Sequence, residues 1–347
     1  MTSRRIHVGG PYFEDLALGQ VFDDAPRVTL TPGHAALHQA LFGDRLRLAL
    51  DATLSEAVTG NARPFANPML VCNLAIGQTT AASQRVLGNL FYRGLVFLRP
   101  AFIGDTLATH TKVVGLRQNA LRPGRPATGM VTLEMEVSNQ DGETVLHFWR
   151  CPMIACRDPE AATGHAGDVD VIPAEVDMGK VKAAVPAGWR LEVFRERCPG
   201  PHFADIEAGV VYDIEARDLV SSAPELARAT LNMAMTHFDA NISVYGVRLV
   251  YGGHVIAMAA AQTLRALPNL VTILAWRSCD HTGPVFEGDV LKTELTVEAT
   301  HPLGRGHGLV DFRAVARAER GGEASRAGME AGAEAEVLDW RFIALLA

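Results

Sequence analysis

The chain repeats itself in sequence. Segments of the first half recur in the same order 184 to 191 residues later. The matching pairs are 12–22 (YFEDLALGQVF) with 202–212 (HFADIEAGVVY), 100–107 (PAFIGDTL) with 284–291 (PVFEGDVL), and Trp149-Arg150 with Trp340-Arg341. Short matches that keep their order are typical of gene duplication, and loop insertions account for the small differences in spacing. The chain therefore folds as two similar units.

Each half follows the same pattern of elements. Apolar and small residues at helical spacing predict a helix over about 68–85 and another over about 253–265. Alternating runs with β-branched residues follow, such as 106–113 and 291–297, and predict half-buried antiparallel strands. One long helix followed by several such strands, twice over, indicates an α+β fold in which a curled sheet wraps each helix.

We place the boundaries of the two units by composition. The first unit is expected over 1–156 and the second over 202–347. The segment 157–201 is rich in Ala, Gly, Pro and Asp and is predicted to connect them. The segment 319–336 has low complexity and is predicted to be a mobile hairpin loop.

Composition excludes several classes of protein. A net charge of −7 gives no field to hold a nucleic acid, and no apolar run reaches the roughly 18 residues that span a bilayer. Five cysteines without CxxC spacing favour a reducing cytoplasm over a disulfide scaffold. The histidines show no metal-binding spacing and no glycine-rich nucleotide loop occurs, so we expect neither a metal nor a cofactor.

Two polar motifs of the second half stand out. Asn232 and His237 form an Asn-x4-His pair, and Tyr251, Gly252, Gly253 and His254 follow as a turn before the predicted helix. With the Pro-x-Phe-x-Gly-Asp segments, these motifs resemble the MaoC-like double hotdog hydratases, and most of all the mesaconyl-CoA hydratase group. The resemblance covers roughly 12–341.

The resemblance implies a double hotdog fold and a hydro-lyase that needs no cofactor. Its partner would be an acyl-CoA thioester, and its reaction the reversible addition of water to a 2-enoyl-CoA. The implied substrate is a short branched dicarboxylyl-CoA such as mesaconyl-CoA, with β-methylmalyl-CoA as product. Further assembly into a homo-oligomer is possible, because the two halves can already pair within one chain.

Neither half keeps the complete catalytic pair of the broader family. That family uses an Asp and a His five residues apart, in Gly-Asp-x-Asn-Pro-x-His. The first half has Asp44 but Ala49 in the place of the histidine, whereas the second has His237 but Asn232 in the place of the aspartate. The usual division of labour between Asp and His is therefore changed in this chain.

Enoyl hydration needs a base for water, an acid for C2 and donors for the thioester oxygen. The free N–H groups of Gly252 and Gly253 at a helix N-terminus suit the oxygen, whereas Pro68, 184 residues before Gly252, has no N–H. We therefore predict one working site, built mainly on the second half, and a vestigial one in the first. His237 is the proton-transfer candidate, and the Asn232 amide positions water or substrate.

Four further residues are candidates, and three of them have a structural alternative beside the functional one. Tyr251 and His254 are candidates for substrate contact or for the core, Asp44 for catalysis or for a turn, and Asp239 for orienting His237. Two other functions compete with hydration. A hotdog thioesterase would need a carboxylate or activated water at the thioester carbon, and a non-catalytic acyl-CoA-binding subunit would bind the ligand without turnover.

Overall fold

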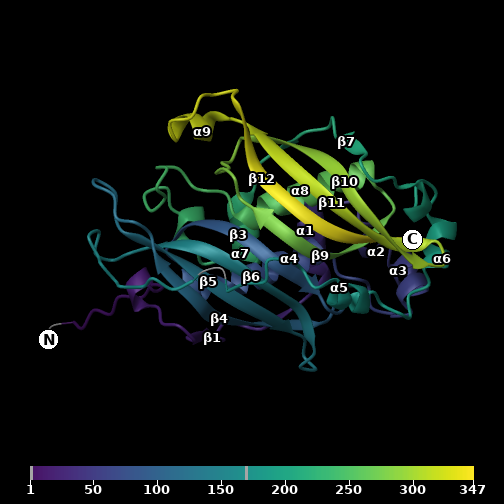
Figure 1. Cartoon of the computed structure of the whole chain (residues 1–347), viewed down its shortest axis with the longest axis horizontal. Helices are drawn as coiled ribbons and strands as arrows, with labels where there is room; N and C mark the ends of the chain where they lie inside the picture. The colour runs from purple at the N-terminus through teal and green to yellow at the C-terminus, as the bar shows by residue number, and fades with distance from the viewer. Residues whose placement is uncertain (1–2, 169–170) are drawn as a thin grey trace.

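A computed structural model describes residues 3–168 and 171–347. Within these residues the strands form one 12-stranded sheet, in the order β1-β4-β5-β6-β3-β9-β12-β11-β10-β7, with β2 beside β4 and β8 beside β10 (Figure 1). The strands of the first half are β1 (Val21–Phe22), β2 (Val28–Thr29), β3 (Val86–Phe97), β4 (Thr106–Gln118), β5 (Thr128–Ser138) and β6 (Thr144–Ala155). Those of the second half are β7 (Val211–Asp213), β8 (Asp218–Leu219), β9 (Leu270–Asp280), β10 (Val290–Gly304), β11 (His307–Glu319) and β12 (Glu334–Leu346).

The strand order is palindromic about the middle of the sheet. Reading outward from the centre, β3, β6, β5 and β4 of the first half correspond to β9, β12, β11 and β10 of the second. The halves meet where β3 pairs antiparallel with β9, with Leu95 opposite Trp276. The predicted duplication and the double hotdog architecture are thus confirmed.

Each half has one long helix against the inner face of the sheet. These are α4 (Pro68–Gln78) and α8 (Gly252–Ala266), which contact one another. Every residue of α4 is buried, and a helix that is apolar all round belongs in such an interior. The other α-helices are α1 (Pro32–Phe42), α2 (Arg47–Leu50), α3 (Ala52–Thr59), α5 (Met178–Ala184), α6 (Leu191–Arg197), α7 (Ala223–Ala229) and α9 (Gly322–Arg326). The 3-10 helices are η1 (Phe13–Asp15), η2 (Thr79–Ser83), η3 (Phe203–Asp205) and η4 (Met235–His237).

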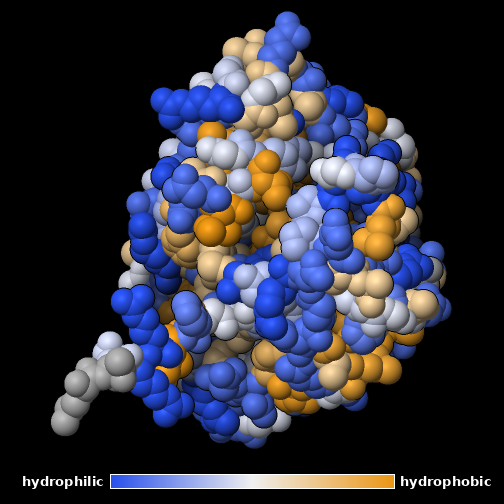
Figure 2. All heavy atoms as spheres, turned by 90° about the vertical axis from the view of Figure 1, so that its left-hand side faces the viewer, coloured by the Kyte–Doolittle hydropathy of each residue, from blue (hydrophilic) through white to orange (hydrophobic). Residues whose placement is uncertain are grey.

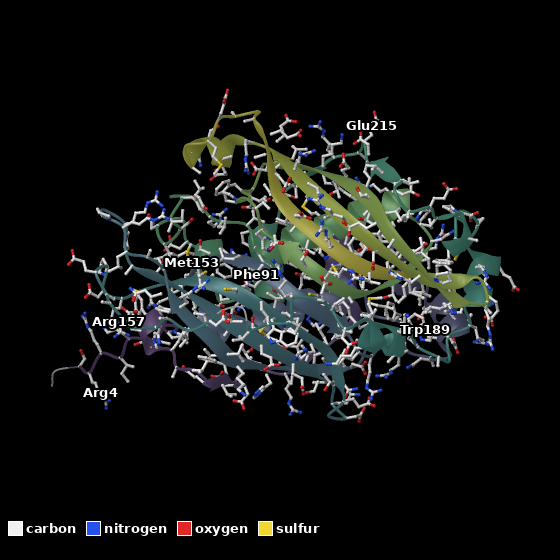
Figure 3. The ribbon with its side chains drawn as sticks, in the orientation of Figure 1. Arg4, Phe91, Met153, Arg157, Trp189 and Glu215 are labelled. Atoms are coloured by element: carbon white, nitrogen blue, oxygen red, sulfur yellow. The ribbon has the colours of Figure 1, made fainter. Side chains whose placement is uncertain are left out.

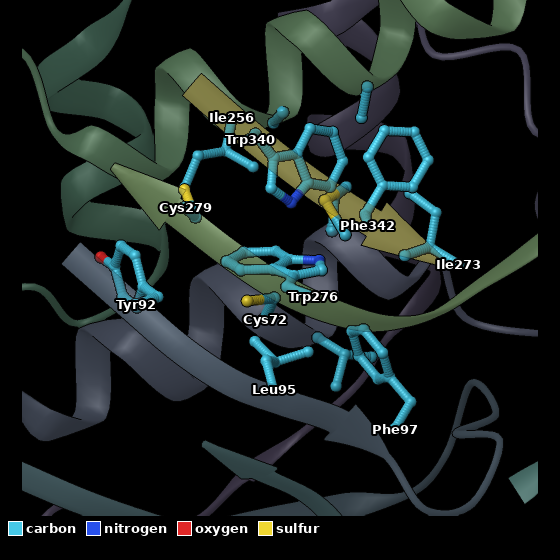
Figure 4. Close-up of a cluster of buried hydrophobic side chains, with 14 of the residues drawn as sticks. Cys72, Tyr92, Leu95, Phe97, Ile256, Ile273, Trp276, Cys279, Trp340 and Phe342 are labelled. Carbon is cyan, nitrogen blue, oxygen red and sulfur yellow. The ribbon is translucent and has the colours of Figure 1, made fainter. Parts of the chain in front are cut away.

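The core is continuous across the junction of the halves. Figure 4 shows side chains of β3, β9 and β12 packed together beneath the helices. The Trp276 and Trp340 rings are 5.4 Å apart in an edge-to-face arrangement, and Tyr92 meets Trp276 at 5.8 Å. Such pairs of large aromatic residues contribute both buried area and geometric preference. The two halves therefore share one core and do not pack as separate domains.

Three segments differ from their sequence-based expectation. The helix predicted over 68–85 ends as an α-helix at Gln78 and continues as η2, because the Thr79 and Thr80 hydroxyls donate to the carbonyls of Ile76 and Gly77. The connector 157–201 contains α5 and α6, and the hairpin segment 319–336 contains α9. No helix of the described residues is long and apolar enough to cross a membrane.

One of the three repeat matches, Trp149-Arg150 with Trp340-Arg341, is out of register in the sheet. Tyr92 pairs with Arg150, whereas Trp276, which lies 184 residues after Tyr92, pairs with Phe342. A bulge next to Arg341 shifts the second-half strand by one residue. Since neighbouring residues of a strand face opposite sides, Arg150 points inward while Arg341 is exposed.

Candidate active site

A cavity of about 320 Å³ opens between the two halves. Its polar and aromatic lining from the second half comprises Asn232, Thr236, His237, Tyr245, Tyr251, His281 and Thr282. Its polar and aromatic lining from the first half comprises Thr80, Asn89, Tyr92 and Arg150. The corresponding side of the molecule is hollowed, with hydrophobic residues around the hollow (Figure 2). Both halves thus line the cavity, and the first half supplies four of these polar and aromatic side chains.

The loop that carries Asn232 is fixed by the first half. Its backbone turns at Leu231, whose φ of 59° lies in the left-handed region that a leucine rarely adopts. The Asn232 Oδ1 atom then accepts a 2.9 Å hydrogen bond from the Ala234 N–H. Met233 N donates to Thr80 Oγ1 at 2.8 Å, which ties the loop to η2. Asn232 lines the cavity, and its amide nitrogen makes no hydrogen bond to described protein atoms.

His237 lies on η4 with its ring against the cavity. Its Nδ1 atom is 2.7 Å from the Leu249 carbonyl oxygen, which can only accept, so Nδ1 carries the proton. Burial lowers the pKa of His237 to about 4; the Leu249 hydrogen bond opposes this and the charge of Arg150 adds to it. At neutral pH the ring is uncharged and its Nε2 atom carries a lone pair, as a general base requires.

The N-terminus of α8 borders the same cavity at Gly252. Its first N–H groups have no partner within the helix and lie at the positive end of the helix dipole. A Cβ at Gly252 would come within 2.5 Å of His281 Nε2, so a larger residue there would force the ring or the helix start to move. A Cβ at Gly253 would instead meet Asn73 Oδ1 at 2.0 Å. Gly253 is absent from the cavity lining and serves the close approach of α8 to α4.

Tyr251 and His254 have different surroundings. Tyr251 lines the cavity, with its ring 5.6 Å from that of His237, and its hydroxyl donates to the Asn73 carbonyl at 3.0 Å. His254 does not line the cavity; its buried ring packs edge-to-face on Phe42 at 4.9 Å. The structure therefore places His254 in the core, which was the alternative to substrate contact.

The two aspartates lie outside the cavity. Asp44 is buried, accepts a 2.8 Å hydrogen bond from Leu46 N and is also bonded by Asn67. Burial raises the pKa of Asp44. Asp239 is exposed and accepts hydrogen bonds from Asn241 at 2.9 and 3.0 Å. Neither is bonded to His237, so both hold turns.

Two cavity residues were missed by the sequence analysis. His281 follows β9, is partly buried, and has a pKa lowered by burial to about 4. Its Nε2 atom is buried without a hydrogen bond. The repeat offered a signal for His281, because the equivalent first-half residue, 184 positions earlier, is the apolar Phe97. A histidine thus occurs only in the second half at this position. Arg150 gave no such signal, because the repeat matches it to another arginine, Arg341. Only the structure shows that Arg150 is buried and Arg341 exposed.

The first half has a much smaller cavity at the equivalent place. It measures about 20 Å³ and is lined by Pro68 and Ala101, which correspond to Gly252 and Val285, and by connector residues that include Trp189. The Trp189 ring meets Phe65 edge-to-face at 5.5 Å. Figure 3 shows Trp189 toward the opposite end of the molecule from Met153, which lines the large cavity. The connector thus fills the space that stays open in the second half.

Comparison with known proteins places the chain in a family. No family model matches it. It is 31% identical to β-methylmalyl-CoA dehydratase of Chloroflexus aurantiacus over 90% of this chain and 89% of that protein. It is 32% identical to mesaconyl-CoA hydratase of Cereibacter sphaeroides, over 82% of each chain. The chain belongs to the MaoC-like double hotdog dehydratases. The predicted enzyme class, a hydro-lyase, is that of this family.

Solved structures agree with this assignment. A Mycobacterium tuberculosis protein with a double hotdog fold is 48% identical and superposes with a TM-score of 0.87, covering 99% of this chain and 100% of that one. A MaoC domain dehydratase from Chloroflexus aurantiacus is 29% identical, with a TM-score of 0.82 and 97% of both chains covered. In this MaoC-like chain, no group of three or more His, Cys, Asp or Glu among the described residues could hold a metal ion.

Proposed function

We propose that this MaoC-like protein reversibly adds water across the double bond of a 2-enoyl-CoA at the cavity between its halves. The observation that carries the proposal is the meeting of His237, Asn232 and the α8 N-terminus at Gly252 around one cavity. A base, a water-positioning amide and a helix N-terminus are the groups that this reaction needs. Similarity to the two curated relatives favours mesaconyl-CoA and β-methylmalyl-CoA as the substrate pair.

A single imidazole, that of His237, carries out both proton transfers. His237 Nε2 takes a proton from a water held by the Asn232 amide, and the water oxygen forms a bond to C3 of the enoyl group. The C2–C3 π electrons move toward the thioester, so negative charge develops on its oxygen. The proton on His237 is then delivered to C2, which completes the addition of one water. Dehydration follows the same steps in reverse.

The enolate oxygen needs donors that face it before the charge appears. The Gly252 N–H lies at the start of α8, and its glycine lets a ligand approach the backbone closely. The equivalent first-half position is Pro68, which lacks this donor, and the first-half cavity is filled. These features support the proposal that the first-half site is vestigial.

The thioesterase alternative would need a carboxylate near the thioester carbon. None of the described residues that line the cavity is an Asp or Glu. This lining favours addition of water at C3 by a histidine over hydrolysis. Release of free thiol from acyl-CoA would identify the thioesterase, and tight binding without turnover would identify a non-catalytic subunit.

Loss of enoyl-thioester absorbance with mesaconyl-CoA and crotonyl-CoA tests the proposal. The wild type should hydrate at least one of them, and His237→Ala should lower kcat by about 10²- to 10⁴-fold, the usual contribution of general acid–base catalysis. His34→Ala is a matched control, because His34 caps α1 at Thr31 outside the cavity. An enzyme that leaves every enoyl-CoA unchanged, or full activity in His237→Ala, would refute the proposal.

A further inference from the structure

Arg150 is a buried cation in the wall of the reaction cavity. It lies on β6, is 3% exposed, and lines the cavity together with His237. Both side chains line the same cavity, and the charge of Arg150 contributes to the lowered pKa of His237. A cationic side chain of the first half thus lies in the wall of the cavity that holds the proposed base of the second.

The guanidinium is only partly satisfied by the protein. Its Nη2 atom donates to Ser83 Oγ at 2.6 Å and to the Thr79 carbonyl at 3.4 Å. Its Nε atom is buried without a hydrogen-bond partner. None of the described Asp or Glu residues forms an ion pair with Arg150, and none lines the cavity. Of the groups that oppose the effect of burial on the pKa of Arg150 (Tyr92, Tyr251 and Cys151), none carries a charge at pH 7.

A buried arginine without an anion is unusual. Arginine stays charged at all ordinary pH values, and charged groups in protein interiors are almost always paired. By contrast, the buried Arg320 of this chain is paired with Asp289 at 3.0 Å. An anion that arrives with the substrate would complete the hydrogen bonding of Arg150, and the planar guanidinium fork suits a carboxylate.

We propose that Arg150 binds a free carboxylate carried by the acyl group, so that the enzyme prefers 2-enoyl-CoA substrates with a carboxylate on or next to C3. This inference rests on the proposed hydration reaction. The position follows from the cavity: His237 activates the water that attacks C3, and Arg150 lines the same cavity, where it can meet a carboxylate carried on or next to C3. Arg150 is thus a specificity-determining residue, whereas the proton-transfer steps belong to His237.

The opposing interpretation is that Arg150 only fastens η2 to the sheet. A purely structural arginine would affect every substrate alike, because η2 also anchors the Asn232 loop through Thr80. Substrates with and without the carboxylate therefore separate the two roles. Mesaconyl-CoA carries the carboxylate, and crotonyl-CoA carries a methyl group at the same carbon.

The first experiment compares kcat/KM for these two substrates in the wild type, Arg150→Gln, Arg150→Lys and the control Arg341→Gln. Arg341 is the sequence match of Arg150 but is exposed and paired with Glu298 at 3.1 Å. Arg150→Gln should lower kcat/KM for mesaconyl-CoA by on the order of 100-fold or more, with a change of no more than about threefold for crotonyl-CoA. Arg150→Lys should recover part of the loss on mesaconyl-CoA alone. Equal losses on both substrates, or no loss on mesaconyl-CoA, would overturn the proposal.

The second experiment measures binding without turnover. Succinyl-CoA and butyryl-CoA are saturated and differ at the carboxylate, so calorimetric titration reads the carboxylate contact separately from hydration. The wild type should bind succinyl-CoA at least tenfold more tightly, and Arg150→Lys, chosen because it keeps the buried charge, should reduce that preference. An enzyme that binds both ligands equally would overturn the carboxylate site even if it hydrates crotonyl-CoA. A preference for succinyl-CoA without hydration of any enoyl-CoA would instead refute the proposed function and leave the carboxylate site standing.

Discussion

The Nδ1 atom of His237 donates a 2.7 Å hydrogen bond to the carbonyl oxygen of Leu249. This contact fixes the tautomer and aims the lone pair of Nε2 away from the backbone. In many enzymes a carboxylate orients the catalytic histidine in this way, whereas here a main-chain carbonyl does so. The carbonyl raises the pKa of the ring but lacks the full negative charge of an aspartate, so burial prevails and lowers that pKa to about 4.

The pH dependence of the reaction should follow from this pKa. The base acts when it is unprotonated, so kcat/KM for hydration should be lost only as pH falls toward about 4. Tyr251 gives no basic limb near neutrality, because burial raises its pKa well above the ordinary value. A pH profile of kcat/KM checks this, with circular dichroism at each pH to confirm folding. An acidic limb centred near 6.5 would contradict it.

Gly252→Ala should impair both activity and packing. The added methyl would lie within 2.5 Å of His281 Nε2, so the start of α8 or the His281 ring must move. We expect roughly 1–3 kcal/mol of destabilisation from overpacking and a kcat lower by about 100-fold from the displaced donor. Gly322→Ala, at a glycine with open space around it, is the control. A Gly252→Ala enzyme with wild-type kcat would show that this amide does not serve the reaction.

Asp44→Asn should leave turnover close to that of the wild type. Asp44 lies outside the cavity and its Oδ1 atom accepts from Leu46 N, a bond that an asparagine oxygen can also accept. We expect kcat/KM within about twofold, as for substitutions away from reacting groups. Steady-state kinetics with the preferred enoyl-CoA provide the measurement. A loss comparable to that of His237→Ala would mean that the first-half aspartate takes part.

Trp189→Ala should lower stability without creating a second active site. The substitution removes the ring that packs on Phe65 and enlarges the first-half cavity, at a cost of about 2 kcal/mol for this partly buried side chain. Pro68 still offers no N–H there, so the variant should keep wild-type kcat. Urea unfolding gives the stability. Activity of the double variant Trp189→Ala with His237→Ala above that of His237→Ala alone would disprove the vestigial site.

His254→Leu should change the pH dependence of stability instead of catalysis. Burial lowers the pKa of His254 to about 4, whereas an unfolded histidine titrates near 6.5. Between these values the unfolded chain binds more protons, so the free energy of unfolding falls as pH decreases from 6.5 toward 4, by about 1.4 kcal/mol per pH unit for this group. Urea unfolding from pH 6.5 to 5 should show that slope reduced by this amount in the variant. An unchanged slope would contradict the core role.

Local patterns predicted the elements well but not their exact ends. The alternation in 106–113 and 291–297 lies in β4 and β10, where inward and outward residues alternate as expected. The first long helix changes to a 3-10 helix at Thr79, because hydroxyl groups there bind the preceding carbonyls. The motif residues His237, Asn232, Tyr251 and Gly252 come together in one cavity, whereas Gly253, His254, Asp44 and Asp239 lie outside it.

The sequence by itself determined the duplication through its repeated motifs and the double hotdog fold through its family resemblance. It also showed the asymmetry between the halves, because a lost N–H or histidine is visible residue by residue. Only the tertiary structure decided which side chains face the cavity. A one-residue shift beside Arg341 reverses the face of a strand, so Arg150 reaches the interior although its sequence match does not. The connector packs into the first-half cavity, and the large cavity lies beside the β3–β9 junction. Contacts between segments so far apart in the chain leave no local pattern in the sequence.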